Sequence, residues 1–274
     1  MGVVFACIAP HGKEIIPELA GDMFNAFAET RRGMEKLARL MMKQKPETIV
    51  LATPHGLRLE ATIGVVISEF TEGTLEANGK QVKLRCECDR ELAKHFLERA
   101  RSLKLPAVGA NYGTSEGPTS CMPMDWGTFI PLWFLTRRPQ NKFTVVVVTP
   151  SREIPLQDLV RLGESIAEAS QTSGKRVAFV ASADQGHTHK PNGPYGFHSA
   201  SAQFDALIRR GVVESDLKPL FHLQQQFIEN AKPDSLWQIA ILQGVLNRVP
   251  MKSHLLSYQA PIYYGMLCAT YMPT

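Results

Sequence analysis

The segment that most restricts the fold is the run FTVVVVT at residues 143–149. Its central positions are all apolar and rich in β-branched side chains, so the run presents no polar face to solvent. Such a run is typical of a central strand in a parallel sheet, which helices cover on both faces. Similar runs occur at residues 3–9, 48–53 and 176–182. The sequence therefore predicts a buried, mainly parallel sheet.

Helical segments alternate with these strands. Residues 28–44 carry apolar side chains at helical spacing, and residues 90–105 and 156–171 show the same pattern. From residue 199 to residue 248 the pattern is mostly helical, with a helix start expected near Pro233. Strands that alternate with helices favour a parallel sheet with helices on both faces.

Residues 74–87 depart from this alternation. Asn78 and Gly79 lie between two β-like runs, a pattern that predicts an antiparallel hairpin with a type I′ turn. The segment APIYYGMLCATYM at residues 260–272 is expected to be a closing strand. Together these elements predict an α/β fold, with residues 1–274 forming a three-layer α/β/α single domain. Its mainly parallel (mixed) central sheet should carry an antiparallel edge hairpin.

Composition and charge exclude several classes of protein. The net charge of +4 comes from 30 basic and 26 acidic residues without a basic stripe, so no nucleic acid partner is expected. No apolar run approaches the roughly 18 residues of a membrane span, and the start of the chain does not resemble a secretory leader. The five cysteines form no C-x-x-C clamp, which favours reduced thiols. We therefore expect a soluble, cytoplasmic protein without a membrane partner.

The tripeptide Pro-His-Gly occurs twice, each time directly after an apolar, strand-like run. The proline ends the strand and the glycine permits a sharp turn, so each motif presents one imidazole, His11 or His55, at a strand exit. Ligands of α/β sheets bind beyond the carboxyl ends of the strands. Two imidazoles at neighbouring exits can bind one metal ion. The alternative is that Pro-His-Gly serves only to form a turn, but its repetition after matching strands favours a metal site.

A third cluster follows the run at residues 176–182, where the chain continues through Asp184, His187, His189 and His198. We expect His187 to act as general acid and base, because it follows the strand end closely and an imidazole titrates near neutral pH. The alternative is a histidine on a surface loop. His189 stays open as a metal ligand, a pocket residue or a surface side chain.

Two histidines need a carboxylate to make a facial iron(II) site with open positions for substrate and dioxygen. The sequence offers Asp22, Asp125, Asp184 and Asp234. Asp234 lies at an expected helix start, where capping of the helix explains an aspartate equally well. From the residues alone, the ligand set is incomplete.

Six motifs along the chain resemble the LigB-type class III extradiol ring-cleavage dioxygenases. In chain order they are APHG (9–12), ETRRGMEKLARLM (29–41), ETIVLATPHG (47–56), MDWGTFIPLWFL (124–135), SADQGH (182–187) and KPDSLWQIAILQG (232–244). The resemblance runs almost from end to end in the right order. It implies an α/β/α fold and a non-haem Fe(II) site held by two histidines and a carboxylate, with Zn or Mn as substitutes for iron.

The resemblance also implies roles for individual residues. His11 and His55 match the two metal-binding histidines of the family, and His187 matches its catalytic histidine. The metal-binding glutamate of the family falls on Ser235, so we take the adjacent Asp234 as the third ligand.

The implied activity is the insertion of both atoms of O2 with opening of the ring of a catechol or a 2-aminophenol. Substrate-pocket residues are expected to be His189, Tyr195, Trp126 and Asp184. Trp126 stands where some members of the family have a histidine, so the substrate contacts should differ. Alternatives are a zinc-dependent hydrolase on the same scaffold, or a non-enzymatic protein, either of the Memo type or a partner subunit. Expected partners are a small aromatic substrate, O2, and copies of the same chain or a second subunit.

Overall fold

The computed structural model describes residues 1–137 and 143–273. The strands in these residues form one sheet of eleven strands. They are β1 (Gly2–Ala9), β2 (Thr48–Ala52), β3 (Ile63–Val66), β4 (Phe70–Ala77), β5 (Lys80–Cys88), β6 (Ala107–Ala110), β7 (Cys121–Pro123), β8 (Thr144–Pro150), β9 (Arg176–Ser182), β10 (Met251–Gln259) and β11 (Met266–Pro273). Each of the apolar runs predicted as a buried strand is a strand of this sheet.

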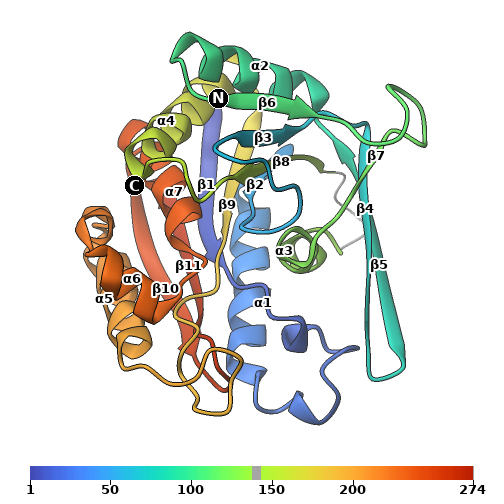
Figure 1. Ribbon diagram of the computed structural model, residues 1–274. Helices are drawn as coiled ribbons and strands as arrows, with labels where there is room; N and C mark the ends of the chain where they lie inside the picture. The colour runs from blue at the N-terminus through green and yellow to red at the C-terminus, as the bar shows by residue number, and fades with distance from the viewer. Residues whose placement is uncertain (138–142, 274) are drawn as a thin grey trace.

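The centre of the sheet is parallel, because β1 pairs with β9, β9 with β2, and β2 with β8, all in the same direction. The strand order along the sheet is β10-β11-β1-β9-β2-β8-β5-β4-β7, and β3 pairs with β8 and β6 beside this path. Strands β10 and β11 add an antiparallel pair at one edge, and β4 and β5 pair antiparallel near the other (Figure 1). The predicted mainly parallel, mixed sheet is confirmed.

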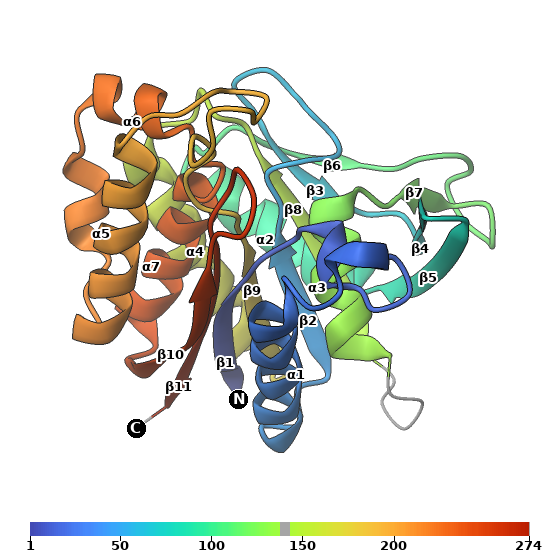
Figure 2. The ribbon, with the colours of Figure 1, turned by 90° about the horizontal axis from the view of Figure 1, so that it is seen from below.

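Helices cover both faces of the sheet, so the predicted three-layer α/β/α architecture is confirmed (Figure 2). One face packs against α1 (Ala28–Lys43) and α3 (Trp126–Thr136). The other face packs against α2 (Arg90–Ser102), α4 (Leu156–Thr172), α5 (Ala200–Glu214) and α7 (Leu236–Arg248). The short helix α6 (Gln225–Ala231) lies beside α5.

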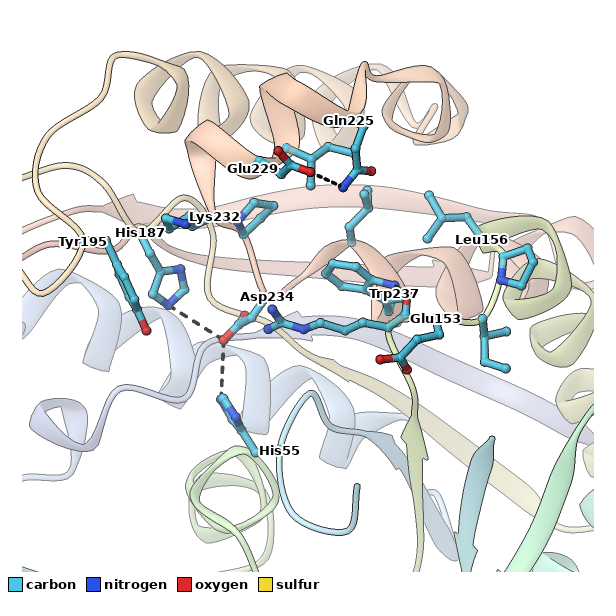
Figure 3. A pocket seen from close by; sticks show the side chains of 16 residues that line it. His55, Glu153, Leu156, His187, Tyr195, Gln225, Glu229, Lys232, Asp234 and Trp237 are labelled. Carbon is cyan, nitrogen blue, oxygen red and sulfur yellow. Dashed lines mark hydrogen bonds and ion pairs between the residues drawn. The ribbon is translucent and has the colours of Figure 1, made fainter. Parts of the chain in front are cut away.

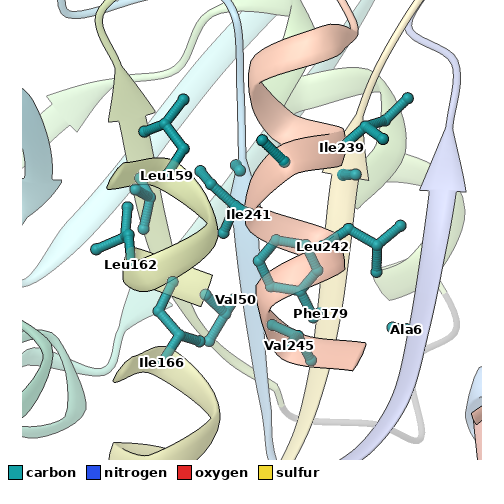
Figure 4. Packing of buried hydrophobic residues seen from close by; sticks show 14 of the residues in the cluster. Ala6, Val50, Leu159, Leu162, Ile166, Phe179, Ile239, Ile241, Leu242 and Val245 are labelled. Carbon is teal, nitrogen blue, oxygen red and sulfur yellow. The ribbon is translucent and has the colours of Figure 1, made fainter. Parts of the chain in front are cut away.

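Helices α4 and α7 pack closely against each other and against the sheet (Figure 4). The apolar side chains buried there include Leu159, Ile166, Phe179, Leu242 and Val245. A Cβ atom on Gly163 would lie 1.9 Å from the carbonyl oxygen of Ile241, and a Cβ atom on Gly244 would lie 1.9 Å from that of Val160. Only glycine permits this approach of the two backbones. The contact fixes the position of α7, and Asp234 lies just before its first turn.

The hairpin predicted at residues 74–87 is present as β4 and β5. Its turn residues Asn78 and Gly79 have φ angles of 52° and 68°. A type I′ turn needs positive φ at both central positions, and asparagine and glycine adopt such angles most easily. The prediction of the hairpin and of its turn is therefore confirmed.

The closing strand is shorter than predicted, because β11 begins only at Met266 and residues 260–265 form a loop. In this loop the Gly265 amide donates to the Gly186 carbonyl, and the Gly265 carbonyl accepts from the Gln185 amide. These hydrogen bonds join the loop to the segment after β9 instead of to the edge of the sheet. Tyr263 and Tyr264, which are predicted to lie in a strand, are thereby placed beside Asp184 and His187.

Two expectations from composition concern the cysteines and the membrane. All five cysteines have free thiols, as expected. Searched over residues 1–137 and 143–273, the chain contains no helix that is long and apolar enough to cross a membrane. That residues 1–274 form a single catalytic domain stays a prediction.

Candidate metal centre

Three neighbouring parallel strands end at the same edge of the sheet and carry the candidate histidines there. His11 follows β1, His55 follows β2, and His187 follows β9, which lies between β1 and β2. Because parallel strands point their carboxyl ends in one direction, residues far apart in the sequence meet at this edge. Asp234 comes to the same place from the segment before α7.

The side chains of His11, His55 and Asp234 converge on one point. The Nε2 atoms of the two histidines lie 3.2 Å apart, and Oδ2 of Asp234 lies 3.1 Å from Nε2 of His11 and 3.4 Å from Nε2 of His55. One donor atom from each residue lies within 4.8 Å of the other two, a spacing that could hold a metal ion. Two imidazole nitrogens and one carboxylate form a donor set that suits a divalent transition metal.

The two Pro-His-Gly turns use glycine for different reasons. Gly56 has a φ of +82°, which side chains rarely adopt. Gly12 has an ordinary φ of −68°, but a Cβ atom there would lie 2.5 Å from the hydroxyl oxygen of Tyr264. Gly12 therefore permits close packing beside His11, and Gly56 permits the sharp turn after His55.

Hydrogen bonds orient the His11 ring. The Ser182 hydroxyl donates to the Gly127 carbonyl at 2.5 Å, so its oxygen is free to accept from Nδ1 of His11 at 3.0 Å. A proton kept on Nδ1 leaves Nε2, the atom that faces Asp234, as the nitrogen that can bind a metal after it loses its own proton. The His11 amide donates to Oδ1 of Asp184, and the Asp184 amide donates to Oδ1 of Asp234. Two of the three candidate ligands are thus held by the segment after β9.

The electrostatics of the cluster favour a bound cation. Burial lowers the pKa of His11, but the carboxylates of Asp184 and Asp234 outweigh burial and raise this pKa to about 9. Burial raises the pKa of Asp234, but its charge interactions and hydrogen bonds with the surrounding histidines hold that pKa below its usual range. The carboxylates that stabilise a positive charge on His11 create a negative potential, and the same potential would stabilise a bound metal cation.

Asp184 is a second carboxylate at this cluster. Its Oδ2 atom lies 3.4 Å from Nε2 of His11, and the residue is buried. Burial raises the pKa of Asp184 to about 7, with a further rise caused by Asp234 and an opposing effect of His11. Asp234 is nevertheless the better placed anionic ligand, because its Oδ2 atom lies within 3.4 Å of Nε2 of both His11 and His55.

His187 lies next to the cluster with one ring nitrogen facing it. Nδ1 of His187 donates to the Gln185 carbonyl at 2.7 Å, so the second nitrogen, Nε2, carries the lone pair. This Nε2 atom lies 3.8 Å from Oδ2 of Asp234. The ring also stacks on Tyr264, with centroids 5.4 Å apart and planes inclined by 24°. Burial lowers the pKa of His187, although Asp234 opposes this effect, and a neutral imidazole can accept a proton.

The segment around Asp234 differs from a simple helix cap. Helix α7 begins at Leu236, with Ser235 at the N-cap position and no hydrogen bond from its side chain. The Ser235 hydroxyl is buried and has no hydrogen-bond partner among the described residues. The Asp234 carboxylate contacts His11 and His55 instead of capping the helix. Of the two neighbouring candidates, the structure brings Asp234 to the cluster and leaves Ser235 outside it.

His189 lies apart from the other histidines of its segment. Its Nε2 atom is 2.8 Å from Oδ2 of Asp205, a buried residue of α5. The same carboxylate accepts hydrogen bonds from the Gly186 amide at 2.8 Å and from the Tyr258 hydroxyl at 2.7 Å. His189 therefore supports the segment that carries His187, rather than lining the pockets at the metal centre.

Two pockets open onto the metal centre from different sides. The first has a volume of about 640 Å³ and lies between the loop after β8 and the start of α7 (Figure 3). The second has a volume of about 490 Å³ and lies against the loop before β11. Both pockets are lined by His55, His187, Tyr195 and Asp234.

The remaining pocket residues predicted from the sequence also lie here. Trp126 stacks on His55 with ring centroids 4.1 Å apart, and both Trp126 and Asp184 line the second pocket. Tyr195 lies 6.2 Å from His187 between ring centroids and is half-exposed. The aromatic rings give the second pocket an apolar wall beside the metal centre.

Some residues of the site were not identified from the sequence. Ser182 is part of the SADQGH motif, but a serine at a strand end carries no signal for its hydrogen bond to His11. The apolar pattern predicts a strand at Tyr263 and Tyr264, although Pro261 and Gly265 on either side indicate a turn. Arg152 lies on a loop after β8, where sequence spacing carries no signal for the site.

The fold and the donor set together define a class: an α/β/α protein with a centre of two histidines and one carboxylate at the carboxyl ends of parallel strands. A family described as the catalytic LigB subunit of aromatic ring-opening dioxygenase matches residues 5–266. The chain belongs to this family, as the motifs indicated, and its scaffold is that of a ring-cleavage dioxygenase.

Two similar proteins add to this comparison. Protein CA_C1420 of Clostridium acetobutylicum is 23% identical over 263 residues, which are 95% of this chain and 56% of that protein. The chain thus spans about half the length of that relative. The crystal structure of uncharacterized protein JW3007 from Escherichia coli K12 has a TM-score of 0.62 at 14% sequence identity, covering 97% of this chain and 99% of that one. This likeness shows a shared fold.

Proposed function

We propose that the protein is a non-haem Fe(II)-dependent extradiol dioxygenase that opens the ring of a catechol or a 2-aminophenol. The observation that carries the proposal is the convergence of His11, His55 and Asp234, with the lone pair of His187 facing the same point. Two histidines and one carboxylate with open positions form the donor set of non-haem Fe(II) oxygenases. Family membership adds support, because the family is described by aromatic ring opening.

In this proposal His11, His55 and Asp234 hold the metal. When bound, Fe(II) supplies Lewis-acid activation of the substrate oxygens and an open position for dioxygen. The hydrogen bond from His11 to Ser182 keeps the Nε2 lone pair directed at the metal. The amide of Asp184 orients the Asp234 carboxylate in the same way.

His187 is the acid and base of the proposed reaction. Its Nε2 atom accepts a proton from the substrate hydroxyl and later returns it, because Nδ1 is already committed to the Gln185 carbonyl. The lowered pKa keeps the ring neutral at the start. Stacking on Tyr264 limits rotation of the ring, so the proton is taken and returned at one position.

The aromatic side chains beside the centre are suited to hold the substrate ring. Trp126 and Tyr264 pack against the two histidines that face the pocket, and Tyr195 stands at its opening. The metal, His187 and Asp184 would supply polar groups beside the ring, and Lys13, Glu14 and Glu76 also line this pocket. The proposed partners are thus a small aromatic molecule and O2; a cytoplasmic location and assembly into a homo-oligomer or with a second subunit stay predictions.

The test is oxygen uptake by the protein after anaerobic loading with Fe(II), using a panel of catechols and 2-aminophenols. We expect oxygen consumption together with the visible absorbance of a ring-cleavage product. Parallel loading with Zn(II) and Mn(II) separates the alternatives. Hydrolytic activity with Zn(II) and no oxygen uptake with Fe(II) would support a zinc-dependent hydrolase, and failure to bind any of the metals would support a non-enzymatic role.

A further inference from the structure

His55 differs from the other two candidate ligands in how its side chain is held. Nδ1 of His11 is hydrogen-bonded to Ser182, and Oδ1 of Asp234 accepts from the Asp184 amide. Within residues 1–137 and 143–273, no group forms a hydrogen bond with Nδ1 of His55. Metal-binding histidines usually donate their second ring N–H to a fixed acceptor. Other contacts therefore have to orient the His55 ring.

The first turn of α3 supplies two of these contacts. The indole of Trp126 stacks on the imidazole of His55, with ring centroids 4.1 Å apart and planes inclined by 32°. A Cβ atom on Gly127 would lie 3.1 Å from Cδ2 of His55, so the backbone of the helix also lies close to this ring. Figure 3 shows the His55 ring pointing at the Asp234 carboxylate. The stacking contact thus limits the tilt of the ring while Nε2 faces the other ligands.

Trp126 is not a core residue of α3. The apolar residues that follow it in the helix, such as Phe129, Ile130 and Leu132, are fully buried, whereas 49% of the Trp126 surface is exposed. Burial in the core therefore does not account for this tryptophan, but contact with His55 does. Because the buried side chains anchor α3 in a closely packed core, the indole is presented to the imidazole from a rigid support.

Asp125 ties the backbone of His55 to the same turn. Its carboxylate caps α3, accepting from the Thr128 amide at 3.0 Å and from the Thr128 hydroxyl at 2.7 Å. Oδ1 of Asp125 also accepts from the Thr53 hydroxyl at 2.8 Å, and the oxygen of this hydroxyl accepts from the His55 amide at 3.2 Å. A Cβ atom on Gly56 would lie 2.7 Å from Oδ2 of Asp125. Asp125 thus contacts the chain on both sides of His55.

The first turn of α3 also reaches His11, through Ser182. The Gly127 carbonyl accepts from the Ser182 hydroxyl, whose oxygen orients the His11 ring. In a regular helix this carbonyl accepts from the N–H four residues later, but here that residue is Pro131, which has no N–H. Pro131 therefore leaves the Gly127 carbonyl available to Ser182. Both candidate histidine ligands thus depend on this turn.

We propose that Asp125 and Trp126 position His55 as a metal ligand. Asp125 fixes the backbone of His55 through Thr53, and Trp126 fixes the plane of its ring. The inference rests on the metal centre of the proposed function, but it does not depend on ring cleavage. Loss of a residue that orients a metal ligand typically weakens metal binding by roughly 10- to 100-fold.

Two matched threonine substitutions test the role of Asp125. Thr53→Val and Thr128→Val each remove one hydroxyl that donates to Asp125, and both threonines are buried. Only Thr53 also contacts the His55 amide. The Kd for Fe(II) is measured anaerobically by competition with a chromophoric chelator. We expect Thr53→Val to raise this Kd by roughly tenfold and Thr128→Val to leave it unchanged.

Substitutions of Trp126 test the stacking contact in the same assay. Trp126→Ala should raise the Kd for Fe(II) by roughly tenfold or more, because the His55 ring is then free to tilt. Trp126→Phe keeps an aromatic face for the imidazole and should restore a Kd close to that of the wild type. Tyr195→Ala is the control, because Tyr195 lines both pockets but stacks on no candidate ligand. Its Kd for Fe(II) should equal that of the wild type.

The inference is overturned if Thr53→Val or Trp126→Ala binds Fe(II) with the wild-type Kd. It is also overturned if Thr128→Val or Tyr195→Ala weakens Fe(II) binding as much as its matched variant does. These titrations need neither substrate nor dioxygen, so they separate the inference from the proposed function. The expected order of Kd values in a protein that consumes no O2 with any catechol or 2-aminophenol would contradict only the proposed function. Ring cleavage together with unchanged Kd values would contradict only the inference.

Discussion

Nε2 of His187 lies 3.8 Å from Oδ2 of Asp234, the same oxygen atom that contacts both His11 and His55. The third histidine in contact with this oxygen, His187, is thus not among the three converging ligands. This arrangement separates two roles. Three side chains can hold a metal ion, and one neutral imidazole beside them can exchange a proton with a bound molecule.

Replacement of His187 by alanine tests this separation. The variant should bind Fe(II) at the wild-type stoichiometry, because the His187 ring is not one of the three converging ligands. Its kcat should fall by roughly 100-fold or more, because acid–base catalysis is lost. Metal content by atomic absorption and kcat by oxygen uptake check both parts. Loss of the metal in His187→Ala would mean that the imidazole is a ligand and that the assigned roles are wrong.

Single replacements of His11, His55 and Asp234 by alanine should abolish stoichiometric Fe(II) binding, since each removes one of three donors. Ser235→Ala is the matched control, because Ser235 lies next to Asp234 and its hydroxyl contacts no ligand. This control should keep both the metal and the activity. Metal retention in Asp234→Ala would point to Asp184 as the anionic ligand.

Asp205 is predicted to position His187 from a distance. Its carboxylate accepts from the Gly186 amide and contacts His189, on either side of His187 in the chain. Asp205→Ala should therefore lower kcat by about 10- to 100-fold through misplacement of the ring, with metal content unchanged. Asp205→Asn keeps an acceptor for the Gly186 amide and should restore much of the activity.

Tyr258→Phe provides the control for Asp205. It removes one hydrogen bond to the same carboxylate, but that bond does not come from the segment around His187. Steady-state kinetics should therefore give a nearly normal kcat for Tyr258→Phe. Equal losses of kcat in Tyr258→Phe and Asp205→Ala would indicate a general effect on folding rather than positioning of the histidine.

Much of this arrangement could be predicted from the sequence, because strands buried on both faces leave continuous apolar runs. Residues 3–9, 48–53 and 176–182 have this pattern, and the side chains that follow parallel strands must meet at one edge of the sheet. His11 and His55 follow from that geometry without any knowledge of the pairing order.

The parts that could not be predicted depend on contacts between distant segments. Asp205 lies within a helix, and nothing in its neighbourhood shows that it contacts His189. Tyr264 is part of an apolar segment, and only the tertiary structure stacks it on His187. Asp234 and Ser235 are neighbours at a helix start, where sequence patterns are least exact, so the sequence alone does not separate them.

Asp89, a buried carboxylate away from the metal centre, predicts a dependence of stability on pH. Burial raises the pKa of Asp89, but hydrogen bonds from Lys175, Thr48 and the Leu92 amide outweigh burial and lower this pKa below its usual value. The stabilisation is therefore present above the unfolded-state pKa of about 3.9 and is lost as the pH falls through the lower folded-state value.

Asp89→Asn keeps a side chain that can cap α2 but removes the charge that binds Lys175. Its free energy of unfolding at pH 7 should be lower than that of the wild type by about 1–2 kcal/mol. The difference should shrink below about pH 4, where the carboxyl is protonated first in the unfolded chain and then, at lower pH, in the folded protein. Urea denaturation at pH 7 and pH 3 measures this change, and a difference that is constant with pH would contradict the assignment.

We propose above that His11, His55 and Asp234 form an Fe(II) site for ring cleavage. The most direct measurement is oxygen uptake by anaerobically Fe(II)-loaded protein with catechol and 2-aminophenol substrates, followed together with product absorbance. We expect one O2 consumed per ring opened, dependent on His11, His55 and Asp234. No oxygen uptake across the panel by protein that has bound one Fe(II) per chain would contradict it.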